Sequence, residues 1–268
     1  MPYYGPSVAT LCREHGLWLV EDCCDALGSK YAGRQVASFG DIATLSFYPA
    51  HHITTGEGGA ILTNNARLAE LVESFQDWGR HCHCRPGQDN ACGKRFSGQY
   101  GDLPEGYDHK YVYAHAGYNL KLTDMAAACG VAQMERLPEF IRKRKENYAF
   151  LRKELQKIPC LRSPSLPAQA NPSWFGLPLL LEDTAPRTRK ELLMELDKRN
   201  IGSRPPFAGN AVRQPFMQGK AYRISGTLEN SDRFMHSGFW LGLWPGLSRP
   251  MLEYMAHSLR EILCSNDA

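Results

Sequence analysis

Two adjacent histidines, His51 and His52, stand between a short apolar run and the glycine-rich turn GEGG. Imidazole changes its protonation state close to pH 7, so a histidine held in place can act as a proton acceptor. A second reactive pair, Glu21-Asp22, directly follows the apolar run LWLV. A carboxylate at the end of a buried strand can stabilise a protonated cofactor ring nitrogen, or it can cap a helix. These two pairs define a candidate site. Residue type alone does not decide whether the carboxylates contact a cofactor or cap a helix.

Four of the nine cysteines could form one metal-binding set. Cys82, Cys84 and Cys92 lie within eleven residues, and Cys24 lies two residues after Asp22. Four thiolates suit either a [2Fe–2S] cluster or a tetrahedral structural zinc, and the spacing does not separate the two. On donor chemistry alone, zinc is slightly favoured. A disulfide framework is not expected, because the sequence shows no export signal.

The surrounding sequence alternates between strand and helix patterns. Continuous apolar runs predict buried strands at 17–20, 43–47 and 58–63. Helix patterns cover 6–15 and 66–79. This alternation predicts an α/β fold with a mainly parallel sheet covered by helices.

The segment 80–118 interrupts this alternation, with little periodicity and many glycines. A connection of this length is usually functional when it is ordered. His81 and His83, which interleave with the cysteines, are expected to be ordinary loop residues. Thr123 is a plausible N-cap for a helix ending at 137, and a second helix is predicted from about Pro138 to 157.

These patterns divide the chain into three predicted parts. Residues 1–137 form a partial cofactor-binding large domain that includes the cysteine-rich loop 80–118, and 138–158 form a connecting helix. Residues 159–268 form a small α+β domain, because the strand WFGLPLLL and the helix TRKELLMELDKRN follow a polar, proline-containing stretch.

Composition excludes several classes of function. The net charge of +3 is spread along the chain, which argues against nucleic-acid or membrane-surface binding. No apolar stretch approaches the roughly 18 residues of a membrane span, and the N-terminus lacks a signal-peptide layout. A cytoplasmic location is therefore expected.

Two longer segments resemble the sugar aminotransferase family of fold type I, known as the DegT/DnrJ/EryC1/StrS family. They are EDCCDALGSKYAGRQVASFGDIATLSFYPAHHITTGEGGAILTNN and GYNLKLTDMAAACGVAQMERL. Members are pyridoxal phosphate (PLP) proteins that act on nucleotide-linked keto sugars. The resemblance implies that Asp22 pairs with the pyridine nitrogen and that Ser46 holds the phosphate. It also implies that Asn119 reaches the phosphate region of a neighbouring subunit's site, and hence a homodimer.

Other positions depart from the family pattern. His51 falls where the family places its Schiff-base lysine, so the cofactor would be held non-covalently as pyridoxamine 5′-phosphate (PMP), with His51 as the base. Asp25 and Tyr48 are also unusual and would face the cofactor. Lys121, which stands where arginine is common, is a weaker candidate for substrate contact. His52 is expected to be a structural neighbour.

The histidine and the added C-x57-C-x-C-x7-C set together resemble one branch of the family, the CDP-6-deoxy-4-keto-glucose 3-dehydrases. These are PMP and [2Fe–2S] enzymes of 3,6-dideoxysugar biosynthesis, which serves lipopolysaccharide. The resemblance implies that Cys24, Cys82, Cys84 and Cys92 are cluster ligands, in place of the zinc favoured above. It also implies a flavin/iron–sulfur reductase as electron donor, and it makes Arg204 a weaker substrate-contact candidate.

Two alternatives remain beside this interpretation. One is a cluster-free NDP-sugar 3-dehydratase or aminotransferase of the same PLP family, and the other is a non-catalytic zinc-binding remnant. Family members carry a long portion before the strand matched by LWLVED, whereas 16 residues precede Leu17 here. The resemblance therefore implies a carboxyl-terminal portion of the enzyme, and the chain alone is expected to lack part of the sheet and of the cofactor pocket.

Overall fold

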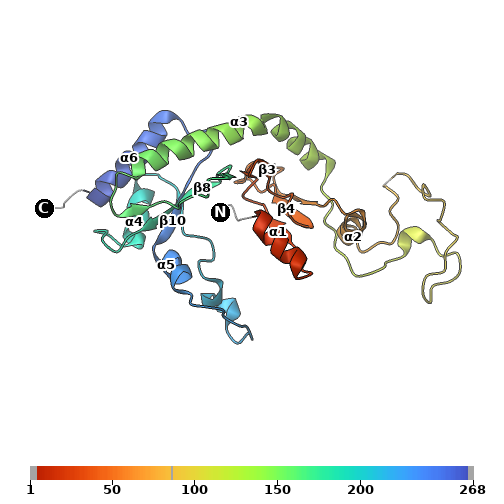
Figure 1. Ribbon diagram of the computed structural model, residues 1–268. Helices are drawn as coiled ribbons and strands as arrows, with labels where there is room; N and C mark the ends of the chain where they lie inside the picture. The colour runs from red at the N-terminus through yellow and green to blue at the C-terminus, as the bar shows by residue number, and fades with distance from the viewer. Residues whose placement is uncertain (1–4, 86, 265–268) are drawn as a thin grey trace. The chain divides into compact units, whose positions relative to one another are not determined.

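The computed structural model describes residues 5–85 and 87–264 (Figure 1). The chain forms two compact units. Within the described residues, the N-terminal unit comprises 5–27 and 34–135, and the C-terminal unit comprises 28–33 and 136–264. No helix in these described ranges is long and apolar enough to cross a membrane.

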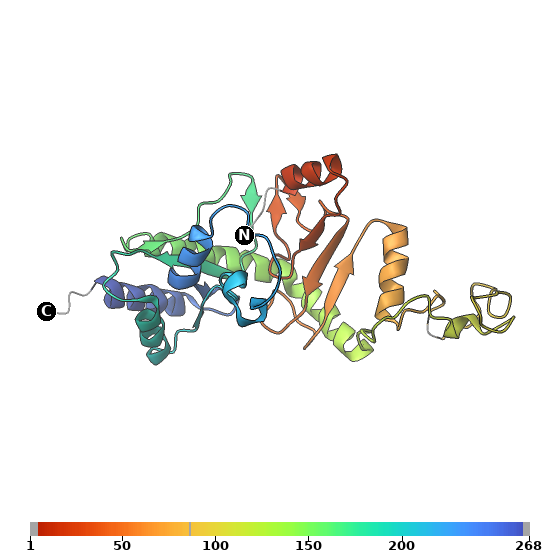
Figure 2. The ribbon, with the colours of Figure 1, turned by 90° about the horizontal axis from the view of Figure 1, so that it is seen from below.

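The N-terminal unit is built on a three-stranded sheet of order β1-β4-β5 (Figure 2). Its elements are α1 (Gly5–Glu14), β1 (Val20–Asp22), β3 (Arg34–Gln35), β4 (Ile42–Ser46), β5 (Gly59–Leu62), α2 (Ala66–Gln76) and the 3-10 helix η1 (His109–Tyr111). β1 and β4 pair in parallel, whereas β4 and β5 are antiparallel. The predicted helices at 6–15 and 66–79 are confirmed as α1 and α2, with Asn65 capping α2 through its side chain.

The parallel pairing of β1 and β4 positions the candidate site. Val20 is opposite Ile42 and Asp22 is opposite Thr44, so both strands end at the same edge of the sheet. The segments that follow the two strands must leave from that edge, because parallel strands share their direction. Residues 22–25 and 46–51 therefore meet although about twenty residues separate them in the sequence.

The helix α3 (Asp124–Leu155) corrects a prediction. A break near Pro138 was expected, because proline lacks the backbone N–H that donates to the preceding turn. The structure instead continues the helix through Pro138. The loss of one backbone hydrogen bond is tolerated because the later turns are held by buried side chains such as Tyr148, Leu151 and Leu155.

The C-terminal unit packs helices on a four-stranded antiparallel sheet of order β6-β8-β10-β9. Beside α3, its elements are β2 (Lys30–Tyr31), β6 (Leu161–Arg162), β7 (Ala170–Asn171), β8 (Gly176–Leu181), α4 (Arg189–Lys198), β9 (Ser203–Arg204), the 3-10 helices η2 (Ala211–Arg213) and η3 (Pro215–Met217), α5 (Glu229–Ser237), β10 (Gly238–Gly242) and α6 (Arg249–Cys264). The short strands β2 and β7 pair antiparallel to each other.

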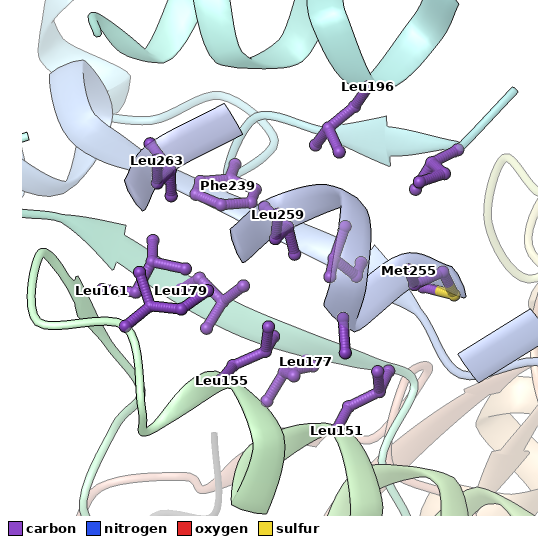
Figure 3. Packing of buried hydrophobic residues seen from close by; sticks show 14 of the residues in the cluster. Leu151, Leu155, Leu161, Leu177, Leu179, Leu196, Phe239, Met255, Leu259 and Leu263 are labelled. Atoms are coloured by element: carbon purple, nitrogen blue, oxygen red, sulfur yellow. The ribbon is translucent and has the colours of Figure 1, made fainter. Parts of the chain in front are cut away.

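The hydrophobic core of the C-terminal unit follows the alternation of its strands (Figure 3). Leu177, Leu179 and Leu181 of β8 are at most 4% exposed, and the residues between them are only partly buried. Leu151 of α3 and Leu259 of α6 pack against this face and are fully buried. Burying a leucine side chain contributes about 1.5–3 kcal/mol, so this cluster is a large source of hydrophobic stabilisation in the C-terminal unit.

Candidate active site

Asp22, the last residue of β1, lies in a polar environment that keeps its carboxylate charged. The backbone N–H of Cys24 donates to Asp22 Oδ1 at 3.1 Å, and the Thr44 hydroxyl donates to the same oxygen at 3.4 Å. The hydrogen bonds from the Cys24 side chain and backbone are the main cause that lowers the pKa of Asp22, and Thr44 and His51 act in the same direction. An exposed, charged carboxylate at this position can pair with a protonated ring nitrogen.

His51 lies at the same edge and faces a second carboxylate. Its Nε2 atom is 3.1 Å from Asp25 Oδ1, and its backbone N–H donates to the Tyr48 carbonyl at 2.9 Å. The Tyr48 ring meets the imidazole edge-on, with the ring centroids 5.5 Å apart. When Asp25 holds the proton on Nε2, Nδ1 becomes the basic nitrogen. The structure thus brings Asp25 and Tyr48 into contact with His51.

Ser46 ends β4 on the approach to His51. Its Oγ accepts a hydrogen bond from the Tyr48 backbone N–H at 3.3 Å, which closes a tight turn. A hydroxyl that accepts one bond can still donate its proton to a phosphate oxygen. His52, the next residue after the base, is only 3% exposed, in agreement with a packing role.

Glu21 has a structural role, in contrast to its neighbour Asp22. The alternation of β1 buries Glu21 to 3% exposure and leaves Asp22 exposed. The Glu21 carboxylate accepts backbone N–H groups of Ala37 at 2.9 Å, and of Phe39 and Gly40 at 2.6 Å each. The turn that leads into β4 is therefore tied to β1 through one side chain.

We expect Glu21→Gln to lower the free energy of unfolding by about 1–3 kcal/mol, because an amide group cannot accept through its nitrogen and leaves a buried N–H unpaired. Urea unfolding followed by circular dichroism measures the change. Glu70→Gln, at an exposed position of α2, is the matched control and should stay within about 0.5 kcal/mol. Equal stability of the two variants would contradict the role assigned to Glu21.

Asn119 and Lys121 lie on a different segment, which pairs with the end of α2. Asn119 forms an isolated antiparallel bridge with Asp77, and the Lys121 ammonium forms an ion pair with the Asp77 carboxylate. Arg80 also pairs with Asp77, at 3.2 Å. Asn119 is exposed, so its side chain is open to a ligand or another chain. Arg204 belongs to β9 of the C-terminal unit, is exposed, and donates to the Ser203 carbonyl at 2.7 Å.

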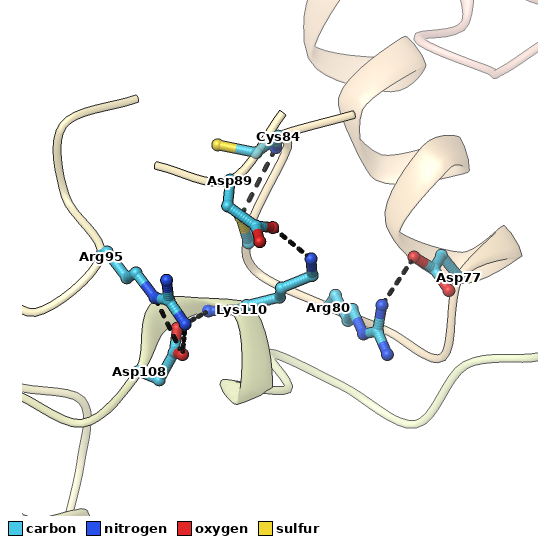
Figure 4. Close-up of polar contacts among 8 residues, drawn as sticks. Asp77, Arg80, Cys84, Asp89, Arg95, Asp108 and Lys110 are labelled. Carbon is cyan, nitrogen blue, oxygen red and sulfur yellow. Dashed lines mark hydrogen bonds and ion pairs between the residues drawn. The ribbon is translucent and has the colours of Figure 1, made fainter. Parts of the chain in front are cut away.

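The cysteine-rich loop is held together by ion pairs (Figure 4). Arg95 pairs with Asp108 at 2.9 Å, and the Lys110 ammonium pairs with Asp89. Asp108 also accepts the backbone N–H of Lys110 at 3.1 Å. Exposed pairs of this kind contribute little individually, but together they connect three distant parts of the loop.

The three loop cysteines line one small pocket. Its lining residues are Cys82, Cys84, Asp89, Asn90, Cys92, Arg95, Asp108, His109 and Lys110. Three thiols in one pocket suit a soft metal ion or an iron–sulfur cluster. Across residues 5–85 and 87–264, however, no three His, Cys, Asp or Glu side chains converge at metal-binding distance.

Cys24 is not among the described residues that line this pocket. Its Sγ lies 3.7 Å from the Thr44 hydroxyl, and burial raises the pKa of Cys24, as does its hydrogen bond to Asp22. The structure thus places Cys24 in the surroundings of Asp22. The structure does not bring the four cysteines of the implied ligand set together: three loop thiols line one pocket, and Cys24 lies apart from it. The neighbouring Cys23 is 2% exposed, and its pKa is raised to about 11, mainly by burial.

Two residues of these surroundings did not emerge from the sequence. Thr44 donates to Asp22 because the two residues are opposite each other in the parallel pairing. His109 is 4% exposed in the loop and touches Cys92, and burial is the main cause that lowers the pKa of His109. The sequence contains no motif that singles out either residue, because both contacts depend on long-range pairing.

Comparisons with known proteins give matches of sequence and of fold. Residues 6–260 match the model of the DegT/DnrJ/EryC1/StrS aminotransferase family. The lipopolysaccharide biosynthesis protein RfbH of Salmonella typhimurium is 51% identical over 260 residues, covering 97% of this chain and 60% of that protein. The dTDP-4-dehydro-2,6-dideoxy-D-glucose 3-dehydratase of Saccharopolyspora spinosa is 45% identical, covering 99% of this chain and 57% of that protein.

A solved structure confirms the fold class expected from the sequence. The E. coli GDP-4-keto-6-deoxy-D-mannose-3-dehydratase with bound hydrated PLP superposes with a TM-score of 0.82 at 22% identity. The match covers 96% of this chain and 64% of that one. The chain therefore spans about 60% of the length of the relatives it matches.

Proposed function

Because the chain belongs to the DegT/DnrJ/EryC1/StrS aminotransferase family, we propose that it carries the core of a PMP-dependent 3-dehydrase for a nucleotide-linked sugar. The substrate would be a CDP-linked 4-keto-6-deoxyhexose, and the product would enter dideoxysugar synthesis for lipopolysaccharide. The observation that carries the proposal is His51, oriented by Asp25 at the sheet edge that also presents Asp22. The name of the 45% identical relative supports a nucleotide-sugar substrate, and that of the 51% identical relative supports a role in lipopolysaccharide synthesis.

The residues at this edge divide the work of binding and proton transfer. PMP, when bound, supplies an amine for the substrate ketone and an electron-accepting ring. Asp22 would hold the positive charge of the ring nitrogen, and Ser46 would donate a hydrogen bond to the phosphate. Tyr48, 48% exposed and edge-on to His51, would face the same space.

His51 would remove the proton from the C4′ carbon next to the ring. The Asp25 carboxylate at Nε2 would orient the ring and stabilise the imidazolium that forms. The imidazole is partly shielded, with 17% of its side chain exposed, which limits competition from bulk water. An imidazole cannot take the place of a lysine in a covalent link to the cofactor, so this site favours elimination over ordinary transamination.

The remaining step requires two electrons. A [2Fe–2S] cluster held by Cys82, Cys84 and Cys92, with Cys24 as fourth ligand, would deliver them singly from a flavin/iron–sulfur reductase. Three of these thiols already share one pocket, and Cys24 would have to leave Thr44 to join them. Asn119, exposed beside Asp77, would contribute to the site of a second subunit in a homodimer.

A metal and colour measurement tests the cluster directly. We expect the purified chain, reconstituted without oxygen, to contain iron and sulfide in equal amounts and to show visible charge-transfer bands. Cys84→Ala should lose both, because it removes one thiolate from the pocket. Cys129→Ala, an exposed cysteine of α3, is the control and should keep them. Zinc without colour would instead support the zinc-binding alternative.

The position of Cys24 favours a second candidate, a cluster-free 3-dehydratase or aminotransferase. In the structure Cys24 hydrogen-bonds to the Asp22 carboxylate and does not line the loop pocket. If wild-type chain binds PMP but no metal, this candidate replaces the first. The role of His51 is common to both dehydratase readings.

A further inference from the structure

The face of the C-terminal sheet that lies opposite its hydrophobic core carries a group of aromatic rings. In β10, Phe239 and Leu241 are fully buried in the core, so the intervening Trp240 points to the other face. The Phe175 and Trp240 ring centroids are 5.0 Å apart, and those of Phe207 and Trp240 are 6.0 Å apart. Three aromatic rings are thus grouped at a face that the core does not use.

Arg204 supplies a cation at the same face. It lies directly opposite Trp240 in the antiparallel pair of β9 and β10, and residues in opposite positions point to the same face of a sheet. Arg204 is exposed and donates from one guanidinium nitrogen to the Ser203 carbonyl at 2.7 Å. It forms no ion pair with any described residue, so its remaining N–H groups can bind an anion.

Phe207 is held in a backbone conformation that bulky residues rarely adopt. Its φ is +44°, in the left-handed region, and 72% of the residue is exposed. The loop that carries it is fixed at both ends, because Arg204 belongs to β9 and Asn210 Nδ2 donates to Asp232 Oδ1 at 2.7 Å. Core packing does not explain a strained and exposed ring, and strain of this kind is found mainly at ligand-binding and catalytic sites.

The charge of the surrounding segment favours an anionic ligand. Residues 203–228 contain no acidic residue and four basic ones, Arg204, Arg213, Lys220 and Arg223. Arg213 is paired with Asp232 of α5 at 2.8 Å, whereas the other three form no ion pair within the described part of the chain. Aromatic rings beside unpaired cations suit a ligand that combines a flat ring with a negatively charged group.

We propose that Phe207, Trp240 and Arg204 form a binding surface for the nucleoside diphosphate part of the substrate. This inference rests on the proposed function, in which the substrate is a nucleotide-linked sugar. The base would stack on the exposed Phe207 ring, which Trp240 supports, and the Arg204 guanidinium would pair with diphosphate oxygens. Every base has a flat π-face, so this surface would bind a nucleotide without selecting among the bases.

Calorimetric titration of the full chain, in the absence of PMP and metal, tests this surface with CDP and inorganic pyrophosphate as probes. Phe207→Leu keeps an apolar side chain without a flat ring, and Arg204→Gln keeps hydrogen-bonding groups without the charge. Two matched controls lie outside the surface. They are Phe216→Leu, at a phenylalanine that is 64% exposed in η3, and Arg67→Gln, at an exposed arginine of α2.

We expect Phe207→Leu to weaken CDP binding about tenfold and to leave pyrophosphate binding unchanged, because it removes one base–aromatic stack. Arg204→Gln should weaken binding of both probes about tenfold, because it removes charged hydrogen bonds to phosphate oxygens. Both controls should bind CDP like the wild type. The proposal is overturned if wild-type chain binds no CDP at millimolar concentration, or if either surface variant binds CDP as well as the wild type.

Two other results would also overturn the proposal. An equal loss of CDP binding in Phe216→Leu would show that any exposed ring of the basic segment contributes, and not this face of the sheet. If Phe207→Leu and Arg204→Gln instead convert a dimer to a monomer in analytical ultracentrifugation, with CDP affinity unchanged, the surface binds a second copy of the chain.

This test is independent of the test of the proposed function. The titration needs neither PMP nor metal, whereas the role of His51 is measured by exchange of the C4′ hydrogen of PMP. If exchange depends on His51 but CDP affinity does not depend on Phe207 and Arg204, only the binding surface is wrong. If CDP affinity depends on both residues but exchange does not depend on His51, the surface stands and the dehydrase function is wrong.

Discussion

Replacing His51 by asparagine is expected to slow exchange of the C4′ hydrogen of bound PMP with solvent deuterium by about 10²–10⁴-fold. Asparagine can still contact Asp25 but cannot accept a proton near pH 7, and a positioned general base typically contributes a factor of this size. NMR or mass spectrometry of PMP incubated with chain and nucleotide-sugar substrate in D₂O gives the exchange rate.

Two further variants make this result specific. Asp25→Asn retains the imidazole but loses the carboxylate at its Nε2, so an intermediate decrease is expected. His15→Asn, at an exposed histidine that follows α1, should leave the exchange rate unchanged. A fluorescence titration checks that PMP still binds to each variant. Exchange by His51→Asn at the wild-type rate would remove His51 from the mechanism.

Replacing Gly79 by alanine is expected to lower the free energy of unfolding by about 2–5 kcal/mol. Gly79 has a φ of +80°, and an added Cβ would lie 1.8 Å from the backbone carbonyl oxygen of His115. Gly117 lies on the opposing backbone segment, and its own added Cβ would lie 2.1 Å from the Gly79 nitrogen. Neither overlap can be relieved by rotating a side chain, because the opposing atoms belong to the backbone.

Gly16→Ala separates the two causes of this destabilisation. Gly16 also has a positive φ, +60°, but an added Cβ meets no atom within 4 Å. Its replacement should therefore cost only about 1–2 kcal/mol, the penalty of left-handed backbone. Denaturant unfolding of both variants measures the difference. Equal losses of stability in the two variants would show that the backbone at His115 and Gly117 can move away from Gly79. The close backbone approach would then not hold the loop to α2.

Prediction from the sequence worked best where local pattern decides structure. The apolar runs and helix periodicity placed α1, β4, β5 and α2 within a few residues of their observed bounds. The prediction at Pro138 was wrong, since local proline chemistry was outweighed by the packing of the later helix. The β4–β5 pair is antiparallel because the chain reverses through 47–58, and strand direction is not encoded in an apolar run.

For the candidate site too, some residues could be identified from the sequence, whereas their contacts could not. Residue chemistry and position at strand ends singled out Asp22 and His51, and the resemblance to the family added Ser46 and grouped the three as one constellation. The partners Asp25 Oδ1 and Thr44 became visible only when the parallel register brought them within hydrogen-bonding range.

The sequence by itself determined which residues can exchange protons, hold an anion or bind a soft metal, since those properties belong to side chains. Tertiary structure alone decided which of them meet. It placed the Cys24 sulfur at the Thr44 hydroxyl, grouped Cys82, Cys84 and Cys92 in one pocket, and brought His109 to Cys92. The physical reason is that these contacts arise from strand register and loop closure, which depend on packing across long stretches of chain.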